Sequence, residues 1–252
     1  MTRTPALFIG HGSPMNALEP SPHTEAWGAL GRRLHPPRAV LCLSAHWLSE
    51  GLWVSGAAAP ETIHDFHGFP AELHALRYPA PGDPALAARL ADRLGAGIDP
   101  LRGLDHGAWS VLLHLFPEAQ VPVLQLSLDV RLGDRGLYAL GARLAALREE
   151  GVLLLGSGNV VHHLGRLRAQ GGAHDWALRF EQQVRRALLA GDDAALIDPA
   201  GADAALAIPT PEHWWPLLPV LGSRAPGEPI ELITEGIELG AISMLSFALG
   251  AA

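Results

Sequence analysis

Histidine is the residue type whose number and placement stand out in this chain. There are 13 histidines in 252 residues, beside only two tyrosines. Three of them come shortly after apolar runs that are typical of strands: His11 after Ala6–Ile9, His46 after Ala39–Ser44 and His162 after Val152–Leu155. Neutral imidazole binds Zn(II) and Fe(II), and its pKa suits proton transfer near neutral pH. A lone histidine beside a glycine turn is more often a hydrogen-bonded turn residue, so it is the repetition that indicates function.

Two further histidines stand next to expected helix starts. His106 lies in Asp105-His106-Gly107, where Asp105 could cap an apolar helix, and His213 lies in Pro211-Glu212-His213. His64 and His67 are intermediate, because they either line a pocket or belong to a compact loop. Five others are expected to be surface or packing residues: His23, His35, His74, His114 and His174.

The elements that must position these histidines alternate between strands and helices. Besides the three runs above, Val121–Ser127 and Ile230–Ile233 have strand character, and none alternates between apolar and polar residues, which predicts strands covered on both faces. Between these runs, apolar residues recur at helical spacing. One such segment begins with the cap Asp83-Pro84 and has leucine at positions 86, 90 and 94. Two more predicted helices cover 137–147 and 176–188.

This alternation predicts an α/β fold, with a central, largely parallel or mixed sheet flanked by helices, in a single domain over residues 1–252. Ligands of such sheets bind beyond the carboxyl ends of the strands. We therefore expect His11, His46 and His162 to meet at one rim of the sheet. The long Pro/Gly-rich stretch from Ala57 to Pro84 is expected to act as a lid or pocket wall.

Composition removes several classes of function. The net charge of −8 argues against a nucleic-acid partner, and the absence of lysine excludes Schiff-base and P-loop lysine chemistry. The single cysteine, Cys42, excludes an intrachain disulfide and a cysteine-rich metal site. No apolar run approaches the roughly 18 residues typical of a membrane span, and no signal peptide is visible, so we expect a cytoplasmic protein. The oligomeric state stays open.

Six segments occur in an order that resembles a known family. They are Gly10-His11-Gly12-Ser13-Pro14, Ser44-Ala45-His46-Trp47, Asp65-Phe66-His67-Gly68-Phe69-Pro70, Asp105-His106-Gly107, Gly156-Ser157-Gly158-Asn159-Val160-Val161-His162 and Pro211-Glu212-His213. Together they resemble the class III extradiol ring-cleavage dioxygenases, in the branch of 4,5-DOPA dioxygenase extradiol-like proteins. Each motif alone is weak, whereas six in order are fairly specific.

The resemblance implies a metal site and a reaction. His11, His46 and His213 would be the metal ligands, and His162 would be the acid/base, either alone or also as a fourth ligand in a resting zinc form. His106 would contact substrate or dioxygen. The working metal would be non-haem Fe(II), with Zn(II) as an option in the isolated protein. The partners would be O2 and a small aromatic diol of the DOPA kind, from which His162 takes a phenolic proton and to which it returns one.

One departure from the family pattern matters. Protocatechuate-cleaving relatives use a glutamate as the third ligand, which completes two histidines and one carboxylate. This chain has His213 there, with Glu212 adjacent. If Glu212 points into the site instead, the assignment of His213 fails.

Other readings of the same residues remain open. The histidines could activate water in a zinc hydrolase, or hold a metal or an aromatic ligand without turnover. A serine hydrolase is weaker, because Ser13 stands one place away from a G-x-S-x-G elbow. The tryptophans at 47, 53, 109, 214 and 215 could shield a flat substrate, although core packing is favoured for each. Arg77 and Arg131 are candidates to meet a substrate carboxylate, and the sequence does not choose between them.

Overall fold

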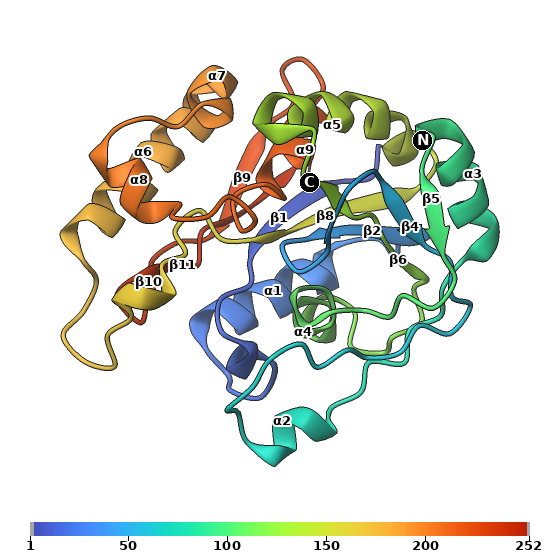
Figure 1. Ribbon diagram of the computed structural model, residues 1–252, viewed down its shortest axis with the longest axis horizontal. Coiled ribbons are helices and arrows are strands. Elements are labelled where there is room, and N and C mark those ends of the chain that lie inside the picture. The colour runs from blue at the N-terminus through green and yellow to red at the C-terminus, as the bar shows by residue number, and fades with distance from the viewer. Residues whose placement is uncertain (1–2, 251–252) are drawn as a thin grey trace.

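A mixed six-stranded sheet forms the centre of the computed structural model, which describes residues 3–250 (Figure 1). Its strand order is β6-β2-β8-β1-β12-β9. The strands are β1 (Ala6–Gly10), β2 (Ala39–Ser44), β6 (Val123–Gln125), β8 (Val152–Gly158), β9 (Ile230–Thr234) and β12 (Ser246–Leu249). β6, β2, β8 and β1 run parallel, β12 is antiparallel to β1, and β9 is antiparallel to β12. The α/β class and the mixed sheet are those expected.

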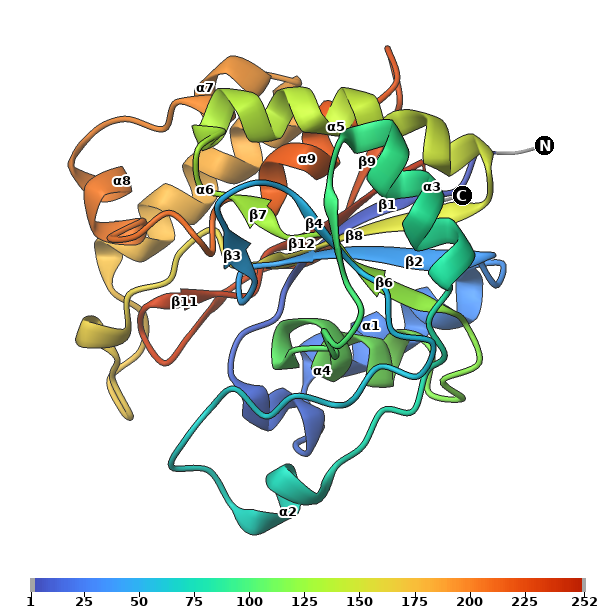
Figure 2. The same ribbon diagram turned by 45° about the vertical axis from the view of Figure 1, so that its right-hand side comes forward.

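Helices cover both faces of this sheet (Figure 2). They are α1 (Pro22–Arg33), α2 (Ala71–Ala75), α3 (Pro84–Leu94), α4 (His106–Leu115), α5 (Gly133–Glu149), α6 (Asp175–Ala190), α7 (Asp193–Ile197), α8 (Ala202–Ala207) and α9 (Leu217–Gly222), with 3-10 turns η1 (Pro14–Ala17) and η2 (Leu164–Arg166). Successive strand residues enter different cores: Phe8 lies in the core to which α3, α5, α6 and α9 contribute, whereas Leu7 and Ile9 lie in the core to which α1 and α4 contribute. Burial on both faces explains why the strands lack polar alternation.

The sequence located the main strands better than the peripheral ones. The strand predicted over Val121–Ser127 is too long, because only Val123–Gln125 pairs with β2. β12 was not expected, since its segment carries no β-branched residue. The two-stranded pairs outside the main sheet were also missed: β3 (Leu48–Ser49) with β7 (Leu128–Asp129), β4 (Trp53–Ser55) with β5 (Gly97–Asp99), and β10 (Ile237–Glu238) with β11 (Ile242–Ser243). They are too short to show periodicity.

The long segment from Ala57 to Pro84 contains only the short helix α2 as helical structure. It is fixed to α4 by Trp109, whose indole Nε1–H donates to the carbonyl of Ile63 at 2.8 Å. Ile63 and Leu104 also bond through the backbone at 2.7 Å. The segment is therefore held against the edge of the sheet where the candidate site lies. Within residues 3–250, no helix is both long and apolar enough to cross a membrane.

A buried ion pair joins α5 to the C-terminal part of the chain. Arg148 has no solvent exposure, and its guanidinium donates to both carboxylate oxygens of Glu228. It also donates to the carbonyls of Thr4, Ser223 and Leu249. Burial favours protonated Glu228, but the hydrogen bonds from Arg148 outweigh it and hold the pKa of that carboxyl below its ordinary value.

We expect Glu228→Gln to cost about 3–5 kcal/mol in the free energy of unfolding, because it leaves the buried Arg148 charge unbalanced. A carboxyl whose pKa is lowered on folding stabilises above its ordinary pKa of about 4.3 and loses that effect as the pH falls through the folded-state pKa. The difference in the free energy of unfolding between wild type and variant should therefore become smaller below about pH 4. Urea denaturation at several pH values measures both effects.

Glu231→Gln is the matched control, since Glu231 pairs with Arg33 on the surface, where both side chains are more than a third exposed. Its cost should stay within about 1 kcal/mol. A Glu228→Gln cost no larger than that of the control would contradict the role of the buried pair.

Candidate metal centre

Three neighbouring parallel strands deliver the histidines to one edge of the sheet. β8 lies between β2 and β1, so the carboxyl ends of all three strands are adjacent. His11 directly follows β1 and its backbone N–H donates to Gly158 at 3.1 Å. His46 follows β2, and the backbone N–H of Ala45, between them, donates to the carbonyl of Ser157 at 3.0 Å. The expected convergence of strand ends is confirmed for His11 and His46.

His213 comes from a distant segment that is attached to the end of β8. The backbone N–H of Asn159 donates to the carbonyl of His213 at 2.9 Å. A Cβ at Gly158 would lie 2.2 Å from that same carbonyl oxygen, so only glycine permits the approach. His162 lies a few residues further along, where its N–H donates to Ala207 at 2.9 Å.

His106 is the first residue of α4, and its position depends on the fully buried Asp105. The Asp105 carboxylate accepts from the N–H of Ala108, which confirms it as the helix cap, and from Ser44 Oγ at 2.7 Å. Arg102 and Gln125 donate to its other oxygen. One carboxylate thus ties the start of α4 to β2 and β6.

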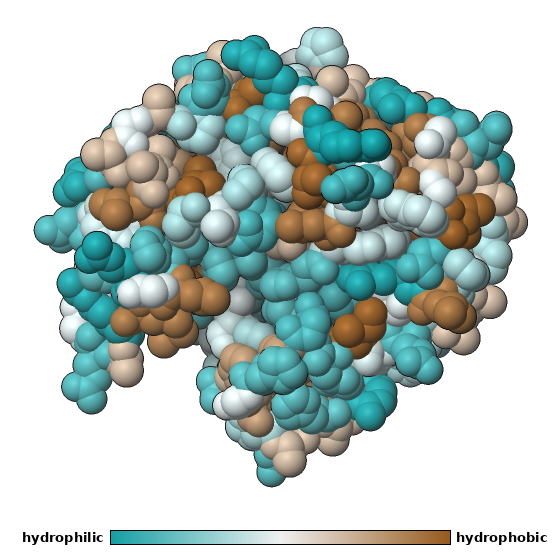
Figure 3. All heavy atoms as spheres, viewed as in Figure 1, coloured by the Kyte–Doolittle hydropathy of each residue, from teal (hydrophilic) through white to brown (hydrophobic). Residues whose placement is uncertain are grey.

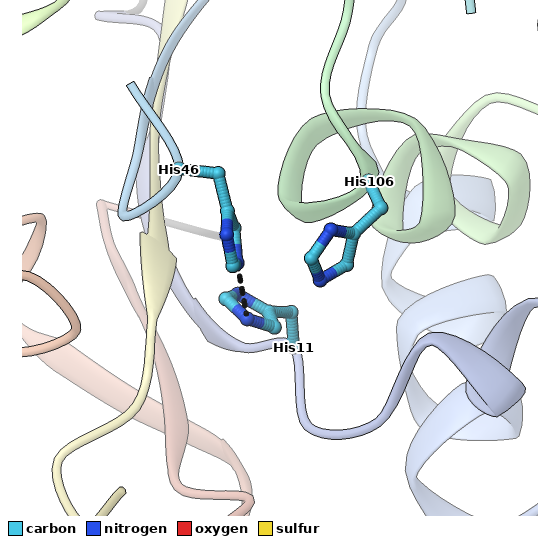
Figure 4. Close-up of side chains that lie close together, drawn as sticks. All are labelled: His11, His46 and His106. Atoms are coloured by element: carbon cyan, nitrogen blue, oxygen red, sulfur yellow. Dashed lines mark hydrogen bonds between the residues drawn. The ribbon is translucent and has the colours of Figure 1, made fainter. Parts of the chain in front are cut away.

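The five histidine rings gather within a few ångströms of one another. The His11 ring centroid lies 5.2 Å from that of His46 and 5.4 Å from that of His213. The His46 centroid lies 5.1 Å from that of His213 and 3.9 Å from that of His106. The His162 ring stacks on His213 at 3.5 Å. Figure 4 shows His11, His46 and His106 pointing toward one another from β1, the segment after β2, and α4.

Hydrogen-bond acceptors occupy the Nδ1 side of four of these rings. Ser157 Oγ donates to the carbonyl of Gly107, so it accepts from His11 Nδ1–H at 3.0 Å. Asp65 lies 3.0 Å from His106 Nδ1 and 3.5 Å from His46 Nδ1. The hydrogen bonds of His11 and His106 therefore favour a proton on Nδ1, which leaves the Nε2 lone pair of these two rings free.

Glu212 plays the same part for His213. Its carboxylate lies 3.4 Å from His213 Nδ1 and also accepts from the Thr210 hydroxyl at 2.6 Å. Hydrogen bonding from His213 lowers the pKa of Glu212 to about 2, so the carboxylate is ionised. Glu212 does not line the cavity described below, whereas His213 does. The inward-pointing glutamate that would have displaced His213 is not seen.

Electrostatics favour the neutral form of four of these rings. Burial, followed by repulsion from neighbouring imidazoles, lowers the pKa of His46 to about 2 and that of His162 to about 3. Burial lowers the pKa of His11 and of His213 in the same direction. Burial pushes the pKa of Asp65 up, but hydrogen bonds and charge from His106 bring it below its usual range. The result is four neutral imidazoles beside an ionised carboxylate, the protonation states in which these groups bind a metal.

The spacing of the nitrogens fits a metal ion. His11 Nε2 and His46 Nε2 lie 3.3 Å apart, within hydrogen-bond distance if one of the two rings carries its proton there (Figure 4). Two nitrogens at 2.0–2.1 Å from a tetrahedral ion would be about 3.3 to 3.4 Å apart. Possible ligand atoms within 4.8 Å of one another form two groups: His11, His46 and His106, and His162, Glu212 and His213. Among the described residues, distance therefore groups His106, rather than His213, with His11 and His46, and the two rings compete as third ligand.

A cavity of about 350 Å³ opens onto the cluster, which is the size of a small-molecule site. All five histidines line it, together with Asp65 and Phe69 from the long 57–84 segment, so the expectation of a pocket wall there is confirmed. The remaining lining residues are Gly12, Ser13, Pro14, Leu164, Leu167, Leu239 and Ile242.

Some residues that the sequence suggested for the site do not line the cavity, and one residue that does line it, Asp65, was not predicted. His64, His67, Arg77, Arg131 and the five tryptophans considered above do not line the cavity. Trp109 and Trp214 are buried in the core, as favoured for them. Asp65 was not singled out, although it stands in a motif rich in aromatic and histidine residues. Its role depends on two histidines from other segments, which no local pattern reveals.

Known proteins resemble this chain over nearly its whole length. The family model described as the catalytic LigB subunit of aromatic ring-opening dioxygenase matches residues 5–235. A relative from Escherichia coli K12 named 4,5-DOPA dioxygenase extradiol is 44% identical, covering 99% of this chain and 96% of that protein. One from Beta vulgaris with the same name is 37% identical, covering 96% and 94%.

The fold is shared as well. A crystal structure of an uncharacterized protein from Escherichia coli K12 superposes with a TM-score of 0.85 at 40% identity, covering 98% of this chain and 99% of that one. Sequence, fold and a histidine cluster at the strand ends agree. The chain belongs to the family of catalytic LigB subunits of aromatic ring-opening dioxygenases, and it is an extradiol ring-cleaving enzyme.

Proposed function

We propose that this enzyme holds one non-haem metal ion through His11, His46 and His213, and that it opens the ring of a small catechol of the DOPA kind with O2. The observation that carries the proposal is the convergence of these three rings, backed at Nδ1 by Ser157, Asp65 and Glu212 at 3.0, 3.5 and 3.4 Å respectively. Such backing fixes the tautomer and the ring orientation of metal-binding histidines. The relatives named 4,5-DOPA dioxygenase extradiol support the substrate class.

The chain's own residues have distinct tasks in this proposal. When bound, the metal, for which we propose Fe(II), supplies the electron transfer that lets dioxygen react with an aromatic ring. His162 takes the phenolic proton, because its lowered pKa keeps the ring neutral and able to accept it. The same imidazole, then charged, returns the proton during ring opening. His106 keeps its proton on Nδ1 against Asp65, so its Nε2 accepts a hydrogen bond from a substrate hydroxyl.

The choice between His213 and His106 as third ligand can be tested by metal content. His213→Ala should lower the bound Fe(II) or Zn(II) below half an equivalent, since it removes a ligand. His106→Ala, a matched removal of a neighbouring ring, should keep about one equivalent. Metal analysis after anaerobic loading and desalting, with circular dichroism to confirm folding, measures this. The opposite result would make His106 the ligand and His213 a substrate contact.

The reaction is tested by dioxygen uptake. Anaerobic Fe(II) loading, followed by catechol and air, should give uptake of one O2 per ring opened, while the Zn(II) form should be inactive because zinc has no redox chemistry. Oxygen electrode traces and the absorbance of the ring-opened product are the readouts. Oxygen-independent turnover by the Zn(II) form would favour a hydrolase. Tight catechol binding without uptake by Fe(II)-loaded protein would favour a non-catalytic binder.

His162→Gln is expected to separate binding from chemistry. Removing a positioned acid/base should lower kcat by about 10²- to 10⁴-fold. Bound metal and the dissociation constant of catechol should change by no more than about threefold, since an amide of similar size remains. His163→Gln is the matched control, because the adjacent ring does not line the cavity. An equal loss in affinity and in kcat would instead assign His162 to substrate or metal binding.

A further inference from the structure

The cavity has a polar floor and an apolar side. The floor is the histidine cluster with Asp65, and the apolar side consists of Leu164, Leu167, Leu239 and Ile242. The three leucines are unusually exposed, with 61% of Leu164, 42% of Leu167 and 43% of Leu239 accessible. In Figure 3, hydrophobic side chains gather where Figure 1 places β10 and β11, at the edge of a hollow. Exposed apolar side chains beside a cavity are typical of a binding surface, and here they mark its mouth.

The substituent on the ring of a bound catechol points from the floor toward this mouth. In the proposed function the diol lies at the floor, where it binds the metal. The side chain of a compound of the DOPA kind is attached on the far side of the ring from the diol. The charged end of that side chain therefore reaches the mouth of the cavity, near the exposed leucines.

The lining itself offers no cation for a carboxylate. Among the described residues that line the cavity none is an arginine, and the chain has no lysine. The one acidic lining residue is Asp65, which repels an anion from the floor. Arg77 and Arg131 do not line the cavity, and Arg131 is already bound to Asp129. A substrate carboxylate therefore needs a partner just beyond the mouth.

Two arginines stand next to the mouth in the segment after β8. Arg166 and Arg168 flank Leu167, and no other arginine lies within three positions of a described lining residue. Both are exposed, and within residues 3–250 neither takes part in an ion pair, whereas the exposed Arg179 pairs with Asp203. Their guanidinium groups are therefore available to a ligand.

Arg168 is fixed against the turn between β10 and β11. Its backbone N–H donates to the carbonyl of Leu239 at 2.8 Å. Leu239 and Gly240 have φ values of 47° and 75°, as in a tight hairpin turn whose two central residues are both left-handed. A Cβ at Gly240 would lie 3.2 Å from Arg168 Cβ and 3.3 Å from Arg168 Cδ, so glycine makes room for the arginine stem. The stem of Arg168 thus lies across the turn, beside a residue that lines the cavity.

We infer that Arg168 binds the carboxylate of the ring substituent and so determines a preference for catechols that carry one. This inference rests on the proposed function for its catechol class. A guanidinium offers two parallel N–H donors that match a carboxylate. At an exposed mouth neither charged group loses all of its water, while the apolar side covers the ring and the carbons of its substituent.

The test compares two ligands that differ in one group. L-DOPA and dopamine share the catechol ring and the amine, and only L-DOPA carries the carboxylate. Binding is measured by calorimetry on Zn(II)-loaded protein under nitrogen, where no turnover occurs. We expect the wild type to bind L-DOPA about fivefold or more tightly than dopamine. Arg168→Gln should weaken L-DOPA binding by about five- to tenfold and leave that of dopamine within about twofold, since it removes only the carboxylate's partner.

Arg166→Gln is the matched control, because it removes an exposed arginine from the same segment. It should leave both affinities within about twofold. Arg168→Lys keeps the charge without the planar fork, so it should recover part of the lost affinity. Raising NaCl from about 50 mM to about 500 mM should weaken L-DOPA binding by the wild type but not by Arg168→Gln, because salt screens an exposed ion pair. Circular dichroism confirms that the variants are folded.

L-DOPA binding by the wild type that is undetectable, or no tighter than dopamine binding, would overturn the inference. An unchanged preference in Arg168→Gln would do so too, and so would equal weakening of both ligands, which would mean a structural role. A loss confined to Arg166→Gln would overturn it and assign the carboxylate to Arg166. The proposed function fails separately, if Fe(II)-loaded protein takes up no dioxygen with any catechol. The binding preference is measured without turnover, so the two failures are distinguishable.

Discussion

The adjacency of three parallel strands is the constraint on which the site depends. β2, β8 and β1 are neighbours in the sheet, so their carboxyl ends open at one edge although they lie far apart in the chain. His11 and His46 leave directly from two of these ends, and the third anchors the backbone of His213 through Asn159. Loss of this strand order would separate the rings whatever their local sequence.

The acceptors behind the histidines are as important as the rings. A cluster of imidazoles has little preference for one tautomer until something binds one nitrogen of each ring. Ser157, Asp65 and Glu212 lie at Nδ1 of His11, His106 and His213, and burial disfavours the charged form of His11 and His213. The protein thus favours a neutral cluster whose free lone pairs face one another, and a cation between them would remove that repulsion.

The site also joins two kinds of surface that different parts of the chain supply. The sheet and α4 provide the polar floor, which suits the diol and the metal that the family's chemistry needs. The segment after β8 and the β10–β11 hairpin provide an apolar side of the cavity, made by Leu164, Leu167, Leu239 and Ile242. The polar and apolar parts of the cavity therefore come from separate elements that meet at His162.

The sequence by itself determined the class of fold and most of the histidines that matter. Uninterrupted apolar runs between amphipathic stripes required covered strands, and the histidines after Ile9 and Ser44 followed from that reading. Asp105 was recognisable as a cap because capping is a local interaction. The order of six motifs indicated the family, to which the chain does belong.

Only the tertiary structure decided what depends on contacts between distant segments. The shared use of Asp65 by His46 and His106, the outward place of Glu212 and the position of Leu239 at the cavity mouth have no signal in local periodicity. Short strands such as β10 and β11 were invisible for the same reason, since two residues show no pattern. Local sequence determines which residues interact within one or two helical turns of each other. Contacts between segments that are distant in the chain depend on how the whole chain packs.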